Sequence, residues 1–185
     1  MQTETYSGDI VIASRRKKSS TLEREFPGYA IIDVTSKASA PWVKFSPFYP
    51  HSGIPIPFSS ETAQSVEGIW QGLKVFEGQD IDPSRFDITD MKGIKRTVRR
   101  YGRVLGHRKG PGGELIPYIE ARKQIYLPAY HWTLTHRLQA ELSQLSELLA
   151  RHEGLVLLDY ETNTDINDPR KPLSHAALIR RFLQP

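Results

Sequence analysis

The chain has 185 residues, enough to bury a core without disulfides or metal ions. Hydrophobic residues make up 38% of it and charged residues 25%, which is typical of a globular protein and excludes a disordered one. The net charge is +4 and cysteine is absent, so a disulfide framework and a thiolate metal site are excluded. We expect a soluble, cytoplasmic protein, because the first twenty residues lack a secretory signal and no apolar run approaches the ~20 residues of a membrane span.

The first sixty residues predict little regular structure. Residues 1–25 are polar and basic, and we expect them to precede the fold and to be frayed at their start. Residues 29–34 are apolar except for Asp33 and include three β-branched side chains, which predicts a short buried strand at the beginning of a single domain that spans residues 26–185. Residues 41–58 contain five prolines interleaved with aromatic side chains, which favours a long ordered loop with at most short edge strands.

Residues 62–76 are predicted to form one helix with two faces. Its apolar residues recur at helical spacing and form a buried stripe: Val66, Ile69, Trp70 and Leu73. A second, polar stripe lies beside it: Glu67, Gln71 and Lys74. Gly68 and Gly72 each cost roughly 1 kcal/mol in a helix interior, so we expect another helix or a ligand to approach the backbone there.

The window from Lys92 to Gly113 contains no acidic residue. Its eight basic residues are Lys92, Lys95, Arg96, Arg99, Arg100, Arg103, Arg108 and Lys109. Ile94, Val98, Tyr101 and Leu105 are spaced to give this window a helical apolar side, and the window ends in a Gly-Pro-Gly-Gly loop. We predict a basic helix that binds phosphate; the alternative is an ordinary solvated helix face.

The remaining elements are mainly helical. Helices are expected over residues 117–126, 133–152 and 173–183, and a buried strand over residues 155–160. The core stripe of the longest helix consists of Leu134, Leu138, Leu142, Leu145 and Leu149. The fold class predicted from these elements is α+β, rich in helix, with short strands and long aromatic and proline-containing loops.

Several kinds of site are excluded. The chain lacks the glycine-rich phosphate and dinucleotide loops, the serine elbow of hydrolases and the histidine pair of zinc helices. His131 and His136 are five residues apart and would face different ways on a helix, so we expect no metal site there. A calcium loop beginning at Asp159 is rejected, because it would need glycine at Thr164 and glutamate at Arg170. We therefore expect no metal and no cofactor.

Two separated groups of carboxylates remain. Glu67 lies on the helix edge, and a polar loop about ninety residues later carries the second group: Asp159, Glu161, Asp165 and Asp168. Cleavage of a bond at an anomeric carbon builds positive charge on the sugar, which one carboxylate can stabilise while another handles the proton. For an arbitrary pair of carboxylates, solvated surface charges would be the better interpretation.

Three motifs that follow one another in the sequence make a catalytic role for these carboxylates the better interpretation. They are Phe-Ser-Pro-Phe-Tyr-Pro over residues 45–50, Ser-Val-Glu-Gly-Ile-Trp-Gln-Gly-Leu-Lys-Val-Phe over residues 65–76, and Arg-Tyr-Gly-Arg over residues 100–103. Together they resemble the NADAR family of YbiA-like N-glycosidases, and the similarity is spread over residues 45–183. Members of that family hydrolyse N-glycosidic bonds in a riboflavin-pathway intermediate or remove ADP-ribose from guanine bases.

The resemblance implies roles for individual residues. The family's catalytic glutamate falls on Glu67, its companions on Gln71 and Lys74, and its active-site tryptophan on Tyr118. Its late catalytic aspartate falls on Asp165, with Asp168 as the alternative. The sequence departs from the family pattern at Gly68, where the family has histidine, and no Trp-Gly follows the aspartate.

The leading hypothesis is therefore a YbiA-like domain that hydrolyses an N-glycosidic bond of a ribose-phosphate substrate, on a nucleotide or on a nucleic acid. Glu67 acts as acid/base, Asp165 steers water or the sugar cation, and Tyr118 stacks the base. The predicted substrate contacts are Gln71, Lys74, Phe48, Arg99, Arg100, Arg103 and Asp168. The rival hypothesis is a non-catalytic module that binds ADP-ribose, a nucleotide or nucleic acid. A third is a partner-binding protein that uses its tryptophans, Trp42, Trp70 and Trp132. The leaving base and the oligomeric state stay open.

Overall fold

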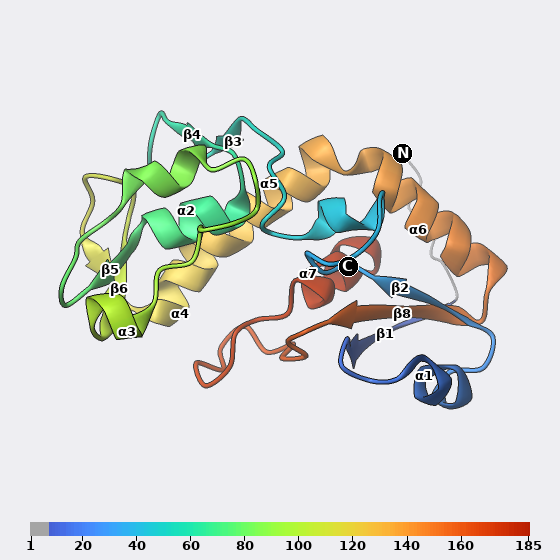
Figure 1. Ribbon diagram of the computed structural model, residues 1–185. Helices are drawn as coiled ribbons and strands as arrows, with labels where there is room; N and C mark the ends of the chain where they lie inside the picture. The colour runs from blue at the N-terminus through green and yellow to red at the C-terminus, as the bar shows by residue number, and fades with distance from the viewer. Residues whose placement is uncertain (1–7) are drawn as a thin grey trace. The chain divides into compact units, whose positions relative to one another are not determined.

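The computed structural model describes residues 8–185, and it confirms a mixture of helices and short strands of the α+β class (Figure 1). The chain divides into two compact units. The first contains the N-terminal part up to Ser46, Leu138–Asp165 and Arg170–Pro185, and the second contains Pro47–Arg137 and Ile166–Pro169. Whether residues 26–185 fold as one domain stays a prediction.

The first unit is built on a three-stranded parallel sheet in the order β1, β8, β2 (Figure 1). The strands are β1 (Asp9–Ser14), β8 (Gly154–Asp159) and β2 (Tyr29–Asp33). Both predicted strands are present, but only β8 is buried as predicted; every residue of β2 is half-buried. Every residue of the central strand β8 is buried, as is typical of a parallel strand that is covered on both faces.

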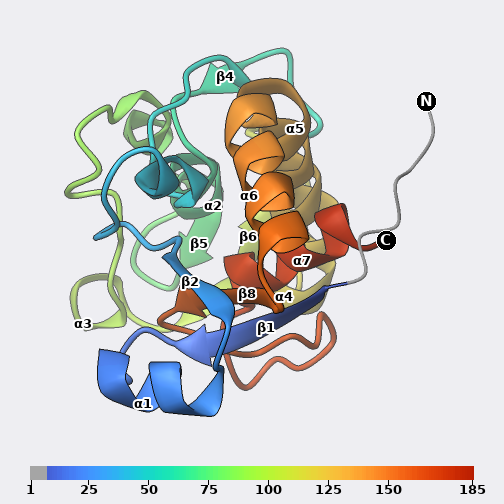
Figure 2. The same ribbon diagram turned by 90° about the vertical axis from the view of Figure 1, so that its right-hand side faces the viewer.

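Helices cover this sheet on its two faces (Figure 2). On one face, Leu22 of α1 (Ser19–Glu25) packs with Ala13, Val156 and Leu158. Helices α6 (Gln139–Arg151) and α7 (His175–Leu183) pack against β8 from the other side. The predicted helix over residues 173–183 is thus confirmed, with Ser174 as its N-cap.

The expectation that residues 1–25 precede the fold is wrong for the described part of that segment. Strand β1 and helix α1 lie within the segment that was predicted to precede the fold, and three of its apolar residues, Ile10, Ala13 and Leu22, are buried. The part of that segment predicted to be frayed, residues 1–7, lies outside the described residues.

The predicted helix over residues 133–152 consists of two helices. Helix α5 (Leu127–Arg137) ends before Leu138, whose φ of −119° and ψ of 19° are not helical, and α6 begins after it. The five leucines of the predicted stripe are nevertheless all buried. Upstream, the predicted helix over residues 117–126 is α4 (Tyr118–Ala121) followed by a π-helical turn, η3 (Arg122–Tyr126), which leads into α5.

The second unit contains the segment predicted as a helix over residues 62–76. Only α2 (Val66–Gly72) is helical there; Thr62–Ala63 forms β4, which pairs with β3 (Ile54–Pro55), and Lys74–Phe76 forms β5. Lys74 therefore lies on a strand, and the prediction that it shares a helix face with Glu67 is wrong.

The predicted basic helix is also wrong. Only α3 (Val98–Tyr101) is helical, because Gly102 ends it with a φ of +83°. The chain then continues as β6 (Val104–Arg108), which pairs on either side with β5 and β7 (Leu115–Ile116). Two of the supposed apolar-face residues, Val98 and Leu105, are 60% and 43% exposed, respectively.

The loop over residues 41–58 contains only the 3₁₀ helix η1 (Trp42–Phe45) and the two residues of β3, which confirms its prediction. Among the described residues, no helix has both the length and the hydropathy that a bilayer crossing requires.

The two glycines of α2 allow a close approach by another helix, the 3₁₀ helix η2 (Pro83–Asp87). A Cβ atom on Gly68 would lie 2.6 Å from the carbonyl oxygen of Arg85, and one on Gly72 would lie 2.2 Å from the ring of Phe86. The sequence predicted that either a helix or a ligand approaches the backbone at these glycines, and in the structure it is the helix η2.

Alanine at Gly68 should destabilise the second unit. Because the clashing atom belongs to the Arg85 backbone, α2 and η2 would have to move apart, and we expect the free energy of unfolding to fall by about 1–3 kcal/mol. Urea denaturation measures this change. Gly112→Ala is the matched control, because nothing lies within 4 Å of the added Cβ there. Equal stability of the two variants would contradict the prediction.

A buried ionic cluster lies at the carboxyl end of β8. The Nδ1 atom of His175 is 2.9 Å from Oδ2 of Asp159, and its Nε2 atom is 2.8 Å from the carbonyl oxygen of Val34. Both neighbours are acceptors, so both ring nitrogens must carry hydrogen and the imidazole is positively charged. Ser174 donates to the same carboxylate oxygen at 2.7 Å. Asp159 is thus part of a structural network, and it carries no role in the proposed chemistry.

The stability of the protein should depend on pH through this pair. Burial alone would raise the pKa of Asp159, but the charge of His175 and the hydrogen bonds lower it to about 2 from 3.8. Burial would also lower the pKa of His175, but Asp159 outweighs it and raises that pKa above 6.5.

The carboxylate's contribution is therefore complete above pH 3.8 and lost as the pH falls toward 2, whereas the imidazolium's contribution is complete below pH 6.5 and lost as the pH rises through its raised pKa. We expect urea denaturation at a series of pH values to show the highest free energy of unfolding between these limits. In His175→Gln the decline on the alkaline side should weaken. An unchanged decline in that variant would contradict the assignment.

Candidate functional site

Glu67 lies in the first turn of α2 and is only 8% exposed. Ser65 caps this helix by accepting a hydrogen bond from the backbone N–H of Gly68 at 3.0 Å. The backbone N–H of Glu67 donates to the carbonyl oxygen of Pro47 at 2.8 Å, which brings the loop that carries Phe48 to the start of the helix. The proline-rich loop therefore borders the predicted acid/base.

Gln71 holds the carboxylate of Glu67 in place. Its Nε2 atom donates to Oε1 of Glu67 at 2.8 Å, and its own Oε1 accepts from the backbone N–H of Arg96 at 3.0 Å. The amide is thereby fixed in one orientation, with its donor toward Glu67 and its acceptor toward Arg96. The prediction that Glu67 and Gln71 lie on the same edge of one helix is confirmed.

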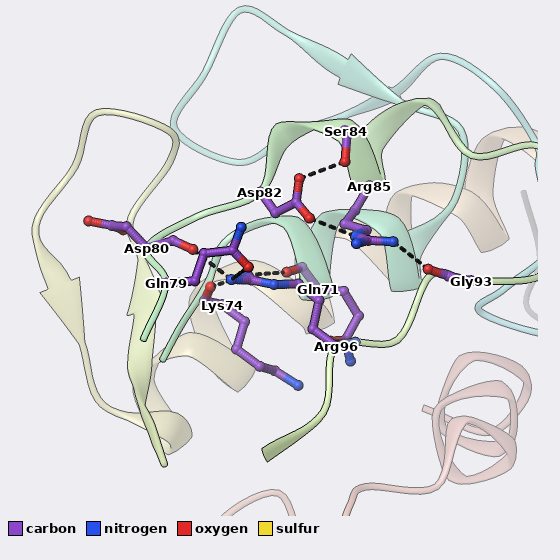
Figure 3. Close-up of polar contacts among 9 residues, drawn as sticks. All are labelled: Gln71, Lys74, Gln79, Asp80, Asp82, Ser84, Arg85, Gly93 and Arg96. Carbon is purple, nitrogen blue, oxygen red and sulfur yellow. Dashed lines mark hydrogen bonds and ion pairs between the residues drawn. The ribbon is translucent and has the colours of Figure 1, made fainter. Parts of the chain in front are cut away.

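Arg96 is the centre of a buried hydrogen-bond network (Figure 3). Its side chain is inserted between α2 and the turn after β5, although Arg96 comes from the segment predicted to form a basic, phosphate-binding helix. The guanidinium donates to four oxygens: the carbonyls of Gln71, Lys74 and Asp80, and Oε1 of Gln79. It also lies 4.8 Å from the ring centroid of Phe76. Arg96 therefore ties β5 and its turn to α2.

A second set of contacts in Figure 3 fixes η2. Asp82 accepts hydrogen bonds from Ser84 at 2.6 Å and from Nε of Arg85 at 2.8 Å. Arg85 also donates to the carbonyl oxygen of Gly93. The segment that leads to Arg96 is thus anchored on the same side of α2.

Lys74 lies beside Glu67 in spite of its position on β5. Burial lowers the pKa of its ammonium; Glu67 partly opposes this change, while Arg96 and Lys95 reinforce it. The Nζ atom is 5.9 Å from the ring centroid of Trp70, and Figure 3 shows the side chain directed away from Arg96. Within residues 8–185 this ammonium has no hydrogen bond and no ion pair. A half-buried cation of this kind is suited to bind an anionic or hydroxyl oxygen of a ligand.

Trp70, which was predicted to belong to the core stripe, is only half-buried and is surrounded by other rings. His107 stacks on it with 3.7 Å between the ring centroids. Tyr118 and Tyr126 meet it edge-on at 5.8 and 5.6 Å. Because Trp70 lies three residues after Glu67 on α2, this aromatic cluster borders the carboxylate.

His107 is completely buried, and neither of its ring nitrogens has a hydrogen-bond partner among the described residues. Burial lowers the pKa of His107 well below 6.5, and the positive charges of Lys74 and Arg96 lower it further. The nearby backbone of Trp70 raises this pKa slightly, although it is not placed to form a hydrogen bond with the imidazole. The imidazole is therefore neutral, and it supports one face of Trp70.

Arg122 connects Tyr118 to the segment that contains Asp168. The guanidinium, from a residue only 2% exposed, donates to the Tyr118 hydroxyl at 2.9 Å and to the carbonyl oxygens of Ile166 and Asp168 at 2.7 and 2.9 Å. Asp168 thus belongs to the unit that contains Glu67. Asp165 belongs to the first unit, where its backbone N–H donates to Oδ1 of Asn163.

The predicted phosphate contacts differ in their surroundings. Arg99 and Arg100 are exposed, and neither forms an ion pair within the described part of the chain. Arg103 binds Glu77, with 3.2 Å between Nε and Oε1, so its charge is partly neutralised. The ring of Phe48 lies 5.3 Å from the ammonium of Lys95.

Residues 8–185 contain no group of three or more histidine, aspartate or glutamate side chains arranged to bind a metal ion. Of the cluster around Glu67, sequence reasoning found Glu67, Gln71, Lys74 and Tyr118. It missed Arg96, His107 and Arg122 as parts of the site. No periodic signal marks these three, because each comes from a different element and is brought in by tertiary packing.

No curated protein matches the sequence. A family model described as a family of unknown function (DUF6939) matches residues 14–179, which include every element from α1 to β8 and most of α7. The chain therefore belongs to the DUF6939 family.

Proposed function

We propose that the protein is an N-glycosidase, which hydrolyses the C–N bond between a base and a ribose phosphate. One observation carries this proposal: the carboxylate of Glu67, oriented by Gln71, lies beside the half-buried ammonium of Lys74 and a cluster of aromatic rings. A proton-transferring group, a cation and ring surfaces are the parts that such a reaction requires.

Glu67 is the acid/base in this proposal. As the bond breaks, the electron pair leaves with the base, positive charge develops on the sugar, and a water oxygen bonds to the anomeric carbon. Glu67 accepts the proton of that water or delivers a proton to the base. The hydrogen bond from Gln71 holds Oε1 of Glu67 in place. The carboxylate therefore keeps its orientation during proton transfer.

The other residues bind the substrate. Lys74 contacts a ribose or phosphate oxygen, Trp70 provides a ring surface for the base, Tyr118 lies at the edge of that surface, and Arg99 and Arg100 hold phosphate. Asp168, which the family resemblance gives as the alternative position of the late aspartate, is the second carboxylate in this proposal, because it lies in the same unit as Glu67. A cytoplasmic location belongs to this proposal, because the lack of cysteine suits a reducing compartment.

The second candidate function is a non-catalytic module that binds ADP-ribose, a nucleotide or nucleic acid. The observation in its favour is a run of exposed cations without ion-pair partners among the described residues: Lys92, Lys95, Arg99 and Arg100. A module that only binds polyanions needs these residues and does not need a buried carboxylate.

Mass spectrometry of reaction products tests the two functions. The protein and its Glu67→Gln variant are incubated with ADP-ribosylated guanine DNA, the riboflavin-pathway aminopyrimidine nucleotide and NAD. Release of a base or of ADP-ribose by the parent but not by the variant supports the enzyme and identifies its substrate. Binding of a ligand without release of any product would favour the module instead.

A further inference from the structure

The hydroxyl group of Tyr118 has an unusual position for a residue expected only to stack against a base. It accepts a hydrogen bond from Nη2 of Arg122 at 2.9 Å. An arginine side chain has donors but no acceptor, so the proton of the hydroxyl cannot point toward it. No acceptor within the described residues receives this proton. The hydroxyl is thus a donor whose proton points away from Arg122.

Arg122 fixes this arrangement. The guanidinium lies with its carbon 4.7 Å from the centroid of the Tyr118 ring, and its other end donates to the carbonyl oxygens of Ile166 and Asp168. A planar group held at three oxygens cannot rotate without breaking hydrogen bonds. The ring itself meets Trp70 edge-on, beside the helix of Glu67. The direction of the phenolic donor is therefore set by the fold before a ligand binds.

We propose that Tyr118 donates a hydrogen bond to a carbonyl oxygen on the base of the substrate, and that Arg122 is the positioning residue which directs this donor. The inference rests on the proposed function and names its substrate class: a nucleotide whose base carries a carbonyl oxygen. When the glycosidic electron pair moves into such a base, negative charge spreads to that oxygen, and a donor aimed at it stabilises the departing group.

The same arrangement provides specificity. A site built around a hydrogen bond discriminates against an analogue that lacks the acceptor, because its polar group is then left without a partner. Discrimination of at least about tenfold is expected for one hydrogen bond of this kind. The phenol should therefore distinguish guanine from 2-aminopurine, which lacks only the carbonyl oxygen and its associated ring hydrogen.

Calorimetric titration tests this inference without requiring turnover. The probes are guanosine 5′-monophosphate and 2-aminopurine riboside 5′-monophosphate, each added to the parent, to Tyr118→Phe and to Glu67→Gln. We expect the parent and Glu67→Gln to bind the guanine nucleotide at least about tenfold more tightly, and Tyr118→Phe to bind both nucleotides equally. Phenylalanine keeps the ring and its packing, so a purely structural role would leave the preference unchanged.

Arg122→Lys extends the test. The ammonium cannot hold all three oxygens, so the preference for the guanine nucleotide should shrink and the backbone amides of residues 166–169 should exchange hydrogen faster. A parent that binds the two nucleotides equally, or binds neither, overturns the inference, and so does a preference that survives in Tyr118→Phe. Failure of the proposed hydrolysis is recognised separately, because it removes product release and leaves nucleotide discrimination in place.

Discussion

Replacement of Glu67 with glutamine should reduce the rate of N-glycosidic hydrolysis by about 10²–10⁴-fold while ligand affinity stays nearly constant. The amide can still accept the hydrogen bond from Gln71, which is 2.8 Å long in the parent, so the shape of the site is kept. It cannot transfer a proton at neutral pH, and the step that needs an acid or base slows. The effect should thus appear in kcat with little change in KM.

Product release measured by mass spectrometry over time gives the rate, and calorimetric titration with ADP-ribose gives the affinity. Glu114→Gln is the matched control, because it makes the same chemical change at an exposed carboxylate. Turnover by Glu67→Gln at the rate of the control would rule Glu67 out as the acid/base. A loss of affinity equal to the loss of rate would instead indicate that Glu67 only binds the ligand.

Arg96→Ala should have the largest effect on stability, a loss of about 3–5 kcal/mol in the free energy of unfolding. The guanidinium is 5% exposed and donates to four oxygens, among them the carbonyls of Gln71 and Lys74. Alanine leaves these acceptors without donors and opens a cavity beside Phe76. Because the network connects β5 with α2, Lys74 should also lose its fixed distance from Glu67.

Urea denaturation of the parent and the variant measures the change. Arg99→Ala is the control from the same segment; its side chain is exposed, and its removal should alter the free energy of unfolding by no more than about 0.5 kcal/mol. Arg96→Lys should recover only part of the loss, because an ammonium reaches fewer of the four oxygens. Equal stability of Arg96→Ala and Arg99→Ala would show that the network contributes nothing net.

The strands and helices of the first unit were the most predictable part of the fold. Residues 29–34 and 155–160 are apolar except for one aspartate each, and burial on both faces of a parallel sheet selects such a composition in the central strand β8. Strand β1 escaped prediction because charged residues surround its short apolar run. The break between α5 and α6 at Leu138 was not predicted either. The helical spacing of the leucines continues across it, and no glycine or proline marks the end of α5.

The candidate site was predictable only where its residues are neighbours in sequence. Glu67 and Gln71 are one helical turn apart, so their hydrogen bond follows from periodicity. Lys74 also lies beside Glu67, but it does so from strand β5, whose backbone Arg96 holds, and not from the same helix. The supposed basic helix failed because charge pattern alone does not distinguish a solvated arginine from one buried among carbonyl oxygens, as Arg96 is.

The central position of β8 has a consequence for the order of events during synthesis. Its residues pair with β1 across a separation such as Asp9 to Gly154, and with β2 across Tyr29 to Gly154. A nascent chain therefore holds two strands with no neighbour until the ribosome has delivered residues 154–159. Closing so long a loop is slow, and strand edges that wait for a partner are prone to join other chains. Helix α1, whose Leu22 packs with Ala13, is the first element available to cover those strands during that interval.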